Sequence, residues 1–495
     1  MARILSIDEG TTGVRGVVVD DQGELLGSAY REFTQHFPEP GWVEHDASEI
    51  WEATIDACAE ALEATATAPD DIDCIGITNQ RETTVLWDRA TLAPVHRAIV
   101  WQDRRTADRC HELSGAGHAT TVRVKTGLVI DAYFSGTKLA WILDHVEGAR
   151  ERAEAGDLAF GTIDTWLVAN ITAGAEHVTE PSTACRTMLW DVRQQRWSST
   201  MTSLLDVPLS VLPEVRDSAG DFGRSDPDSF LGIDAPVTGI LGDQQAALFG
   251  QGCWEPGTSK NTYGTGSFLL LNTGQEASHS ENGLLTSAAW RIDGETTYVL
   301  EGSIFVTGAA VQWLRDELGI ITNAAETEAL AAQVPAGNEG VYLVPAFAGL
   351  GAPHWDPHAR ASLTGLTRGT GRAHLARAAI EAMAYQSHDV IRLMEEESGT
   401  ALAELRVDGG AAANDLLCQF QADVLDVPVL RPEVTETTVL GAALVAGLGA
   451  GVWSSTDELA SVWRLDRRFE PRMSEETRHE VLAGWKRAVA RTVDH

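Results

Sequence analysis

Two stretches of the chain share one pattern: an apolar strand, a turn rich in glycine and threonine, and a second apolar strand. The first covers residues 4–20, with its turn at Asp8-Glu9-Gly10-Thr11-Thr12-Gly13, and the second covers residues 260–271. Glycines let backbone N–H groups approach a ligand closely, and consecutive N–H groups in such a turn bind anions. Asp8, beside the first turn, is suited to hold Mg²⁺ through water. One such turn is also typical of an ordinary hairpin, but two in one chain favour two halves that face one polyphosphate.

The charge of the chain restricts its partners. Its 495 residues carry a formal charge of −35, and only four of the 37 basic residues are lysines. Because nucleic acids and anionic membranes need patches of lysine and arginine, neither is expected as a partner. The acidity suits a high-salt cytoplasm, where screening removes self-repulsion, or it reflects a bias in composition. Both explanations stay open.

Cysteine usage and hydropathy indicate the compartment. The six cysteines are scattered without a Cys-x-x-Cys pair, which is typical of buried thiols in a reducing cytoplasm. Asp8 and Glu9 interrupt any signal-like apolar run, and no stretch approaches the roughly 18 apolar residues of a membrane span. A cytoplasmic protein without membrane insertion is expected, and a homodimer and a homotetramer both stay open.

Strands and helices alternate along the chain, which predicts an α/β protein. Strands are expected at 14–19, 24–28, 72–78, 99–101 and 237–241, and helices at 137–146, 164–170, 243–249, 307–318, 373–398, 412–425, 439–449 and 474–493. Another helix is expected after Asp46, with Asp46 and Glu49 as a capping box. The length predicts about two to three domains. A turn signal at 254–257 divides the chain into expected domains 1–253 and 254–495.

The common phosphate-binding motifs do not explain the two turns. A P-loop needs Gly-Lys-Ser/Thr, and none of the four lysines follows a glycine. The chain also lacks the His-Arg-Asp loop of protein kinases, the Gly-x-Gly-x-x-Gly turn of dinucleotide-binding folds and a ligand set for structural zinc. A third glycine-rich segment at 405–414 predicts a strand, a tight turn and a helix start. Such a turn can pass under a nucleotide base, with Asn414 reaching toward that base. A simple strand–helix turn without a ligand is the alternative.

Six further segments are similar to the FGGY carbohydrate kinases, a family within the actin, hexokinase and Hsp70-like ATPases. These segments are 40–46, 76–84, 101–106, 126–138, 242–251 and 349–357. Together with the two turns, the resemblance covers about residues 3–453. It implies two duplicated ribonuclease H-like (actin-like ATPase) domains around a catalytic cleft. The segments around Arg81-Glu82 and Tyr133 resemble glycerol kinases rather than sugar kinases at large.

The resemblance implies ATP-dependent phosphorylation of glycerol to sn-glycerol 3-phosphate, with Mg²⁺. Asp243 would be the general base that accepts the proton of the attacking hydroxyl. The implied glycerol-binding residues are Arg81, Glu82, Tyr133, Asp243 and Gln244, with Trp101 and Phe268 as apolar walls. The implied ATP-binding residues are Thr11, Thr12, Gly13, Arg15, Thr265, Gly308, Gln312, Gly410 and Asn414, and Asp8 would hold Mg²⁺ through water.

Two positions depart from the family pattern. Glu9 stands where glycerol kinases commonly carry Gln, and Gly13 stands where they often carry Ser, which removes one hydroxyl from the first turn. Two other functions are alternatives. An FGGY kinase for another polyol or a ketose is the nearest enzymatic alternative, and the Arg81-Glu82 and Tyr133 set favours glycerol over it. A non-enzymatic nucleotide binder of the same superfamily is disfavoured by Asp243.

Overall fold

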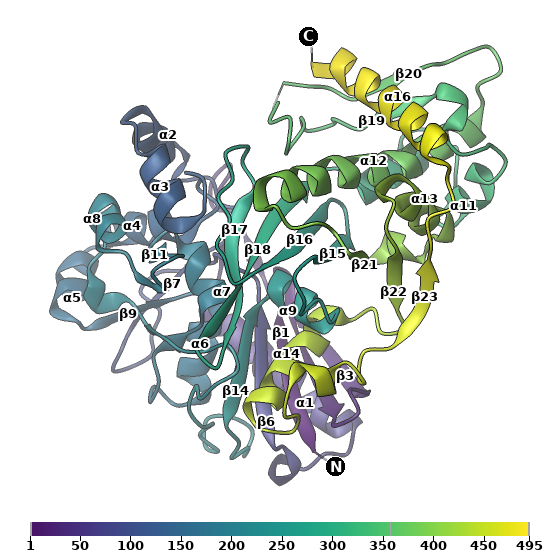
Figure 1. The fold of residues 1–495 in the computed structure, drawn as a ribbon. Helices are drawn as coiled ribbons and strands as arrows, with labels where there is room; N and C mark the ends of the chain where they lie inside the picture. The colour runs from purple at the N-terminus through teal and green to yellow at the C-terminus, as the bar shows by residue number, and fades with distance from the viewer. Residues whose placement is uncertain (1, 357, 494–495) are drawn as a thin grey trace.

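A computed structural model describes residues 2–356 and 358–493, which form two large sheets with helices on both faces of each, and several smaller sheets (Figure 1). Pro357, the last residue of the sixth similar segment, lies outside the described residues. Among the described residues, no helix is both long and apolar enough to cross a lipid bilayer.

The first sheet has the strand order β14-β6-β1-β2-β3. Its strands are β1 (Arg3–Glu9), β2 (Gly13–Asp20), β3 (Leu25–Glu32), β6 (Cys74–Asn79) and β14 (Val237–Gly242). Strands β1, β2 and β3 pair in antiparallel fashion, whereas β6 runs parallel to β1 and β14 runs parallel to β6. The first glycine–threonine turn is therefore the hairpin between β1 and β2.

The second sheet repeats this arrangement with one extra strand at each edge. Its order is β17-β18-β16-β15-β21-β22-β23. The strands are β15 (Thr258–Tyr263), β16 (Ser267–Gly274), β17 (Leu285–Ile292), β18 (Glu295–Ile304), β21 (Glu404–Asp408), β22 (Val429–Pro432) and β23 (Leu465–Phe469). The hairpin β15–β16 is antiparallel and β21 runs parallel to β15, as β6 does to β1. The expected duplicated α/β fold is confirmed.

Two helices cross between the sheets. Helix α9 (Asp243–Gly250) follows β14, and α14 (Thr437–Gly449) follows β22. A Cβ added at Gly441 would lie 1.9 Å from the carbonyl oxygen of Ala246, and one at Gly250 would lie 2.0 Å from that of Thr437. The backbones of α9 and α14 thus approach as closely as glycine allows.

Helix α14 belongs to the C-terminal half of the sequence but packs on the first sheet. In Figure 1 this yellow-green helix lies beside the purple strands from the start of the chain. The hydroxyls of Ser6 and Thr238, on β1 and β14, each donate to a carbonyl of α14 at 2.7 Å. Apolar side chains of α14 join one buried cluster with Ile4 of β1 and Leu270 of β16. This cluster therefore joins both sheets.

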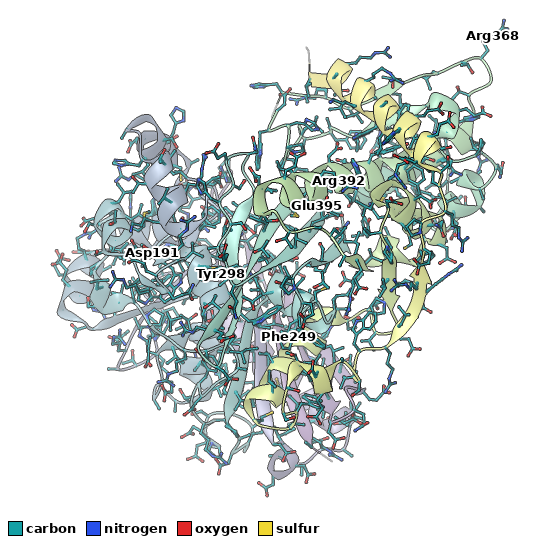
Figure 2. All side chains as sticks on the ribbon, in the orientation of Figure 1. Asp191, Phe249, Tyr298, Arg368, Arg392 and Glu395 are labelled. Atoms are coloured by element: carbon teal, nitrogen blue, oxygen red, sulfur yellow. The ribbon has the colours of Figure 1, made fainter. Side chains whose placement is uncertain are left out.

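Phe249 of α9, labelled in Figure 2, belongs to the same cluster. Its ring lies edge-on to that of Trp290 from β17, with 5.1 Å between ring centroids. The other face of the first sheet is covered by α1 (Ala47–Ala64) and α6 (Ile163–Ile171), whose apolar residues form a separate cluster with β1, β2 and β6.

The part of the sequence between β6 and β14 forms a set of smaller elements, which make up the left side of Figure 1. They are β7 (Val85–Asp88), α2 (Ala107–Gly115), α3 (Ala119–Thr126), α4 (Ser135–His145), α5 (Ala149–Ala155), β9 (Leu158–Gly161) and α8 (Ser199–Leu205). The second half adds α10 (Gly308–Asp316), α11 (Glu326–Ala331), α12 (Arg372–Ser398), α13 (Asp415–Leu425) and α16 (Glu475–Val493).

Two local expectations are wrong. Asp46 caps α1 by accepting the N–H of Ser48 at 2.9 Å, but no capping box forms, because the Glu49 carboxylate accepts the N–H of Thr34 at 3.1 Å instead. Helix α13 begins three residues later than expected. A 3₁₀ turn occupies Gly410–Ala413, and the Asn414 side chain caps the helix by accepting the N–H of Leu417 at 3.0 Å.

Candidate active site

The first turn faces a cavity of about 200 Å³ between the two halves. Within the turn, the N–H of Gly10 donates to the carbonyl of Gly13 at 3.0 Å. The lining residues are Asp8, Gly10, Thr12, Gly13, Arg15 and Tyr30 from the first half and Thr435, Glu436, Thr437 and Thr438 from the second. Four residues expected around the first turn, namely Asp8, Thr12, Gly13 and Arg15, therefore share one cavity.

Carboxylates dominate the electrostatics of this cavity. Burial raises the pKa of Asp8 to about 7, and Asp243 and Glu436 add to the rise while Arg15 opposes it. The Arg15 guanidinium forms an ion pair with Glu436 at the start of α14. A ligand that brings positive charge would relieve this cluster, because it would favour the ionised form of Asp8.

The neighbours of Gly13 leave no room for a side chain at this position. A Cβ at this position would lie 2.4 Å from the carbonyl oxygen of Arg31 and 2.6 Å from the phenol carbon of Tyr30. The Tyr30 hydroxyl is hydrogen bonded to the Thr12 hydroxyl at 3.0 Å. Tyr30 therefore occupies the space beside the turn that a side chain at position 13 would need.

Glu9, the other departure from the family pattern, is fully buried. One of its carboxylate oxygens accepts from the Gln80 amide at 3.0 Å, and the other has no hydrogen-bond partner in the described part of the chain. Burial raises the pKa of Glu9 well above its ordinary value of 4.5, and Asp8 and Asp243 add to the rise. A protonated Glu9 is uncharged, like the Gln it replaces.

Asp243 is the first residue of α9 and lies beside Arg81. The Arg81 Nε lies 3.0 Å from Asp243 Oδ1, and the backbone N–H of Gln244 donates to the same oxygen at 2.6 Å. The Asp243 side chain is 34% exposed, whereas that of Arg81 is 2% exposed. The carboxylate is thus held by Arg81 on its buried side and remains partly exposed.

A buried network of four charges stands behind Asp243. Arg81 donates through Nη1 and Nη2 to the two carboxylate oxygens of Glu301, at 2.7 and 3.0 Å, and through Nη1 to Gln245 at 3.2 Å. Arg186 donates to Glu82 at 2.5 Å and lies 3.5 Å from Glu301. All four charged side chains are at most 2% exposed. Most donors of the Arg81 fork are therefore used within the protein.

Arg186 and Glu301 are site residues that the sequence analysis missed. Burial alone would raise the pKa of Glu301, but Arg186 and Arg81 outweigh it and hold that pKa at about 2. The sequence holds one signal for Glu301, which is the only charged residue within 298–304. Arg186 gave no such signal, since its partners are more than 100 residues away in sequence.

Aromatic residues connect this network to the first turn. The Tyr133 ring lies 5.5 Å below the Arg186 guanidinium and packs edge-on against Trp101 at 5.6 Å. The Trp101 indole N–H donates to the Thr11 hydroxyl at 3.0 Å. Phe268 lies on β16 beside the second turn, opposite Thr262 of β15. The structure thus brings Tyr133, Trp101 and Thr11 into one chain of contacts.

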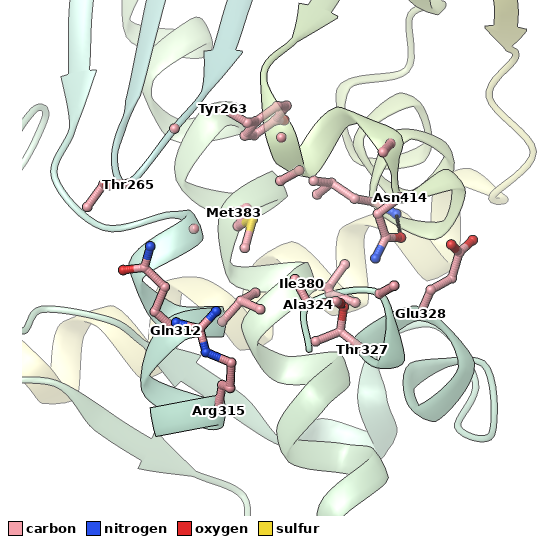
Figure 3. A pocket seen from close by; sticks show the side chains of 18 residues that line it. Tyr263, Thr265, Gln312, Arg315, Ala324, Thr327, Glu328, Ile380, Met383 and Asn414 are labelled. Carbon is pink, nitrogen blue, oxygen red and sulfur yellow. Dashed lines mark hydrogen bonds between the residues drawn. The ribbon is translucent and has the colours of Figure 1, made fainter. Parts of the chain in front are cut away.

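A larger cavity of about 440 Å³ lies beyond the second turn (Figure 3). Figure 3 shows Thr265 and Gln312 on one side and Asn414 on the other. Five of the residues expected to bind ATP line it: Thr265, Gly308, Gln312, Gly410 and Asn414. Gly308 has no room for a side chain, since its Cβ would lie 2.5 Å from the Gly264 carbonyl oxygen. The volume and the convergent polar groups suit a small organic ligand.

Comparison with known proteins identifies the family. The model of the N-terminal domain of the FGGY family of carbohydrate kinases matches residues 3–250, and the model of the C-terminal domain matches residues 259–450. The chain belongs to the FGGY family of carbohydrate kinases. Two similar relatives are a glycerol kinase of Deinococcus radiodurans, 57% identical over 99% of this chain and 97% of that protein, and glycerol kinase 2 of Thermotoga maritima, 55% identical over 100% and 99%.

Solved structures support the same family. The Plasmodium falciparum glycerol kinase with ADP superposes on this FGGY kinase with a TM-score of 0.95 at 34% identity, covering 100% of this chain and 98% of that one. A xylulose kinase of Lactobacillus acidophilus, at 19% identity and a TM-score of 0.88 over 100% and 97% of the two chains, shares the fold. The two large sheets are therefore the architecture of an FGGY kinase.

Proposed function

We propose that this FGGY kinase transfers the γ-phosphoryl group of ATP to glycerol, producing sn-glycerol 3-phosphate and ADP. The position of Asp243 carries the proposal. Its carboxylate lies 3.0 Å from Arg81 in the buried network and acts on the pKa of Asp8 in the cavity at the first turn. An alcohol held by the network would lie next to the phosphate-binding side of the site. The relatives named glycerol kinase support the choice of alcohol.

Glycerol is small, so its affinity must come from a few well-placed hydrogen bonds. The residues that we assign to its recognition are Arg81, Glu82, Tyr133, Asp243 and Gln244, with Trp101 and Phe268 against its carbon atoms. Because Glu301 and Gln245 engage most of the Arg81 donors, Arg81 contributes orientation and charge as well as a hydrogen bond.

Asp243 acts as the general base in this scheme. Its carboxylate accepts the proton of the attacking glycerol hydroxyl, the glycerol oxygen forms the new bond to the γ-phosphorus, and the bond to the β-phosphate oxygen of ATP breaks to release ADP. Positioning and charge stabilisation supply most of the catalysis in phosphoryl transfer. The ion pair with Arg81 fixes the carboxylate before the substrate arrives.

ATP would span both cavities. The residues assigned to it are Thr11, Thr12, Gly13 and Arg15 at the first turn and Thr265, Gly308, Gln312, Gly410 and Asn414 around the larger cavity. Asp8 fits a role in holding Mg²⁺ through water, because its pKa near 7 and its acidic surroundings favour a bound cation. Mg²⁺ held there would offset the negative charge of the ATP phosphates.

The same proposal covers the organisation of the chain. Residues 1–253 form the glycerol domain with the first turn, and residues 254–495 form the domain with the second turn and the adenosine site. The connection between α9 and β15 is where the chain passes from the first sheet to the second. A cytoplasmic enzyme agrees with six cysteines that are all free and buried.

An assay of ADP release tests the function. We expect turnover with glycerol, much lower kcat/KM with erythritol and xylulose, and little ADP without an acceptor. A higher kcat/KM with xylulose would instead support an FGGY kinase for a ketose. ADP release that is equally fast without any acceptor would contradict kinase activity.

A further inference from the structure

Lys260 is a buried cation that the scheme above does not use. It lies in β15, the strand that leads into the second turn, and is fully buried. Its ammonium donates to the side-chain oxygen of Gln244 and to the Thr262 hydroxyl at 2.9 Å. Lys260 belongs to the second sheet and Gln244 to helix α9, so the first of these bonds links the two halves.

The charge of Lys260 is maintained by more distant groups. Within residues 2–356 and 358–493 no ion pair of Lys260 is found, although the negative charges of Asp408, Asp243 and Glu301 favour its protonated form. Burial lowers the pKa of Lys260 to about 8, and Arg81 adds to this decrease. At neutral pH the side chain is therefore mainly an ammonium ion.

An ammonium group can donate hydrogen bonds but cannot accept them. It therefore selects one of the two orientations of the Gln244 amide, the one in which the oxygen faces Lys260. The amide NH₂ then points away from Lys260, and no acceptor for it is present in the described part of the protein. This group is free to donate to a ligand, next to the carboxylate of Asp243.

We infer that Lys260 is a positioning residue for the alcohol substrate. Lys260 fixes the Gln244 amide so that the NH₂ group of Gln244 faces the substrate oxygen. The inference rests on the proposed function and adds a residue of the second half to alcohol recognition. Lys260 itself does not touch the alcohol. Its loss would let the amide rotate, so that a donor no longer faces the substrate in every molecule.

A double-mutant cycle tests this arrangement. Lys260→Met keeps the length and apolar volume of the side chain without a buried charge, so the variant is expected to fold. We expect Lys260→Met and Gln244→Ala each to raise the glycerol KM about 2- to 12-fold, as for loss of one neutral hydrogen bond, with kcat and the ATP KM little changed. If Lys260 acts through Gln244, the double variant matches Gln244→Ala alone.

A second variant at position 244 keeps the bond from Lys260 and removes only the donor that faces the substrate. Gln244→Glu keeps an acceptor for Lys260 but has no N–H to offer the substrate, so it should raise the glycerol KM at least as much as Gln244→Ala. Lys125→Met is the control. Lys125 forms an ion pair with Asp191, 3.1 Å long, outside the site, so its loss should leave the glycerol KM unchanged. Melting temperatures of all variants report on folding.

Three results would overturn the inference. Additive effects in the double variant would mean that Lys260 acts independently of Gln244. A rise confined to the ATP KM would mean that Lys260 serves the nucleotide. An unchanged glycerol KM in a folded Lys260→Met variant would mean that it serves neither substrate. Wild-type protein without glycerol-dependent ADP release would overturn the proposed function, and the inference with it.

Discussion

The carboxylate of Asp243 is partly exposed yet fixed by its ion pair with Arg81, which is the environment that a general base requires. Asp243→Asn keeps an oxygen for Arg81 and Gln244 but cannot take up the proton. We expect turnover to fall roughly 10²- to 10⁴-fold at saturating glycerol. The measurement is coupled ADP release, and calorimetry with ADP should show nearly unchanged nucleotide binding. Retention of more than about a tenth of wild-type turnover would contradict the assignment.

Glu9 provides a prediction about stability and pH. A carboxyl whose pKa is raised on folding holds more protons in the folded than in the unfolded state, so its contribution to stability decreases as the pH rises above the unfolded value of 4.5. Glu9→Gln removes this titration and keeps an acceptor for Gln80. We expect the melting temperature of the variant to exceed that of the wild type by an amount that grows from pH 5 to pH 8.

Asp8, whose pKa is also raised, titrates in both proteins, so the difference between them reports the loss of the Glu9 carboxyl together with its interaction with Asp8. A melting-temperature difference that stays constant over this range would show that Glu9 ionises as readily in the folded as in the unfolded protein.

At the scale of secondary structure, the crossing of α9 and α14 is a close contact between the backbones of the two halves. Replacing Gly441 by Ala places a methyl group where only 1.9 Å separates it from the carbonyl oxygen of Ala246. We expect Gly441→Ala to reduce the free energy of unfolding by about 1–3 kcal/mol or more, since the helices must move apart. Urea denaturation measures the change.

A glycine of another helix serves as the control. Gly115 ends α2, and a Cβ there would have no atom within 4 Å. Gly115→Ala should therefore be neutral or stabilise the protein by up to about 1 kcal/mol through helix propensity. Equal destabilisation by both substitutions would contradict the steric explanation for Gly441.

The sequence predicts elements better than it predicts their partners. The positions of β2, α9, α12 and α14 agree with their patterns to within two residues, because strand alternation and helix periodicity are local properties. Glu49 and Asn414 show the limit. Both have the residue type of a helix cap, yet Glu49 binds the backbone of Thr34 before the helix, and Asn414 caps a helix that starts later than the apolar pattern does.

The candidate site shows the same limit more strongly. Glycine and threonine identify the turns because turns are local, and the family resemblance supplies Asp243 and Arg81. Glu301 and Lys260 act across the two halves. Folding brings them to their partners Arg81 and Gln244, and no local pattern in the sequence marks these pairs. Pairs of buried charges that are distant in sequence become visible only in the fold.

For the whole molecule, the acidic surface predicts a response to salt. The formal charge of −35 repels itself, and the Debye length falls from about 10 Å at 0.1 M salt to about 3 Å at 1 M. We expect activity and melting temperature to rise as KCl increases from about 0.1 to about 2 M. A flat or falling melting temperature would mean that the acidity is a bias of composition without a role in a saline cytoplasm.

The two halves also predict a movement. ATP would contact residues of both, and transfer requires that water be excluded. The carbonyls of Cys253 and Trp254 each accept from the Asn272 amide at 3.0 Å, which ties the connection between α9 and β15 to the second sheet. We expect the two halves to close by a hinge rotation near residues 253–257, the connection that these bonds join to the second sheet.

Small-angle scattering measures this movement. The radius of gyration should decrease when glycerol and a non-hydrolysable ATP analogue are added together, and ATP hydrolysis without glycerol should remain slow. An unchanged radius of gyration combined with glycerol-independent hydrolysis at nearly the full rate would contradict closure.

The place of α14 on the first sheet has a consequence for the synthesis of the protein. All strands of that sheet have been synthesised once β14 is complete. The helix that covers one of their faces ends at Gly449, about 200 residues later. At roughly 5–20 residues per second, this delay lasts on the order of 10–40 s. During that time the apolar side chains of β1 and β14 that await α14 remain open to water and to other nascent chains. The newborn N-terminal half is therefore a natural client for chaperones, and a gene fragment that stops before α14 should yield insoluble protein.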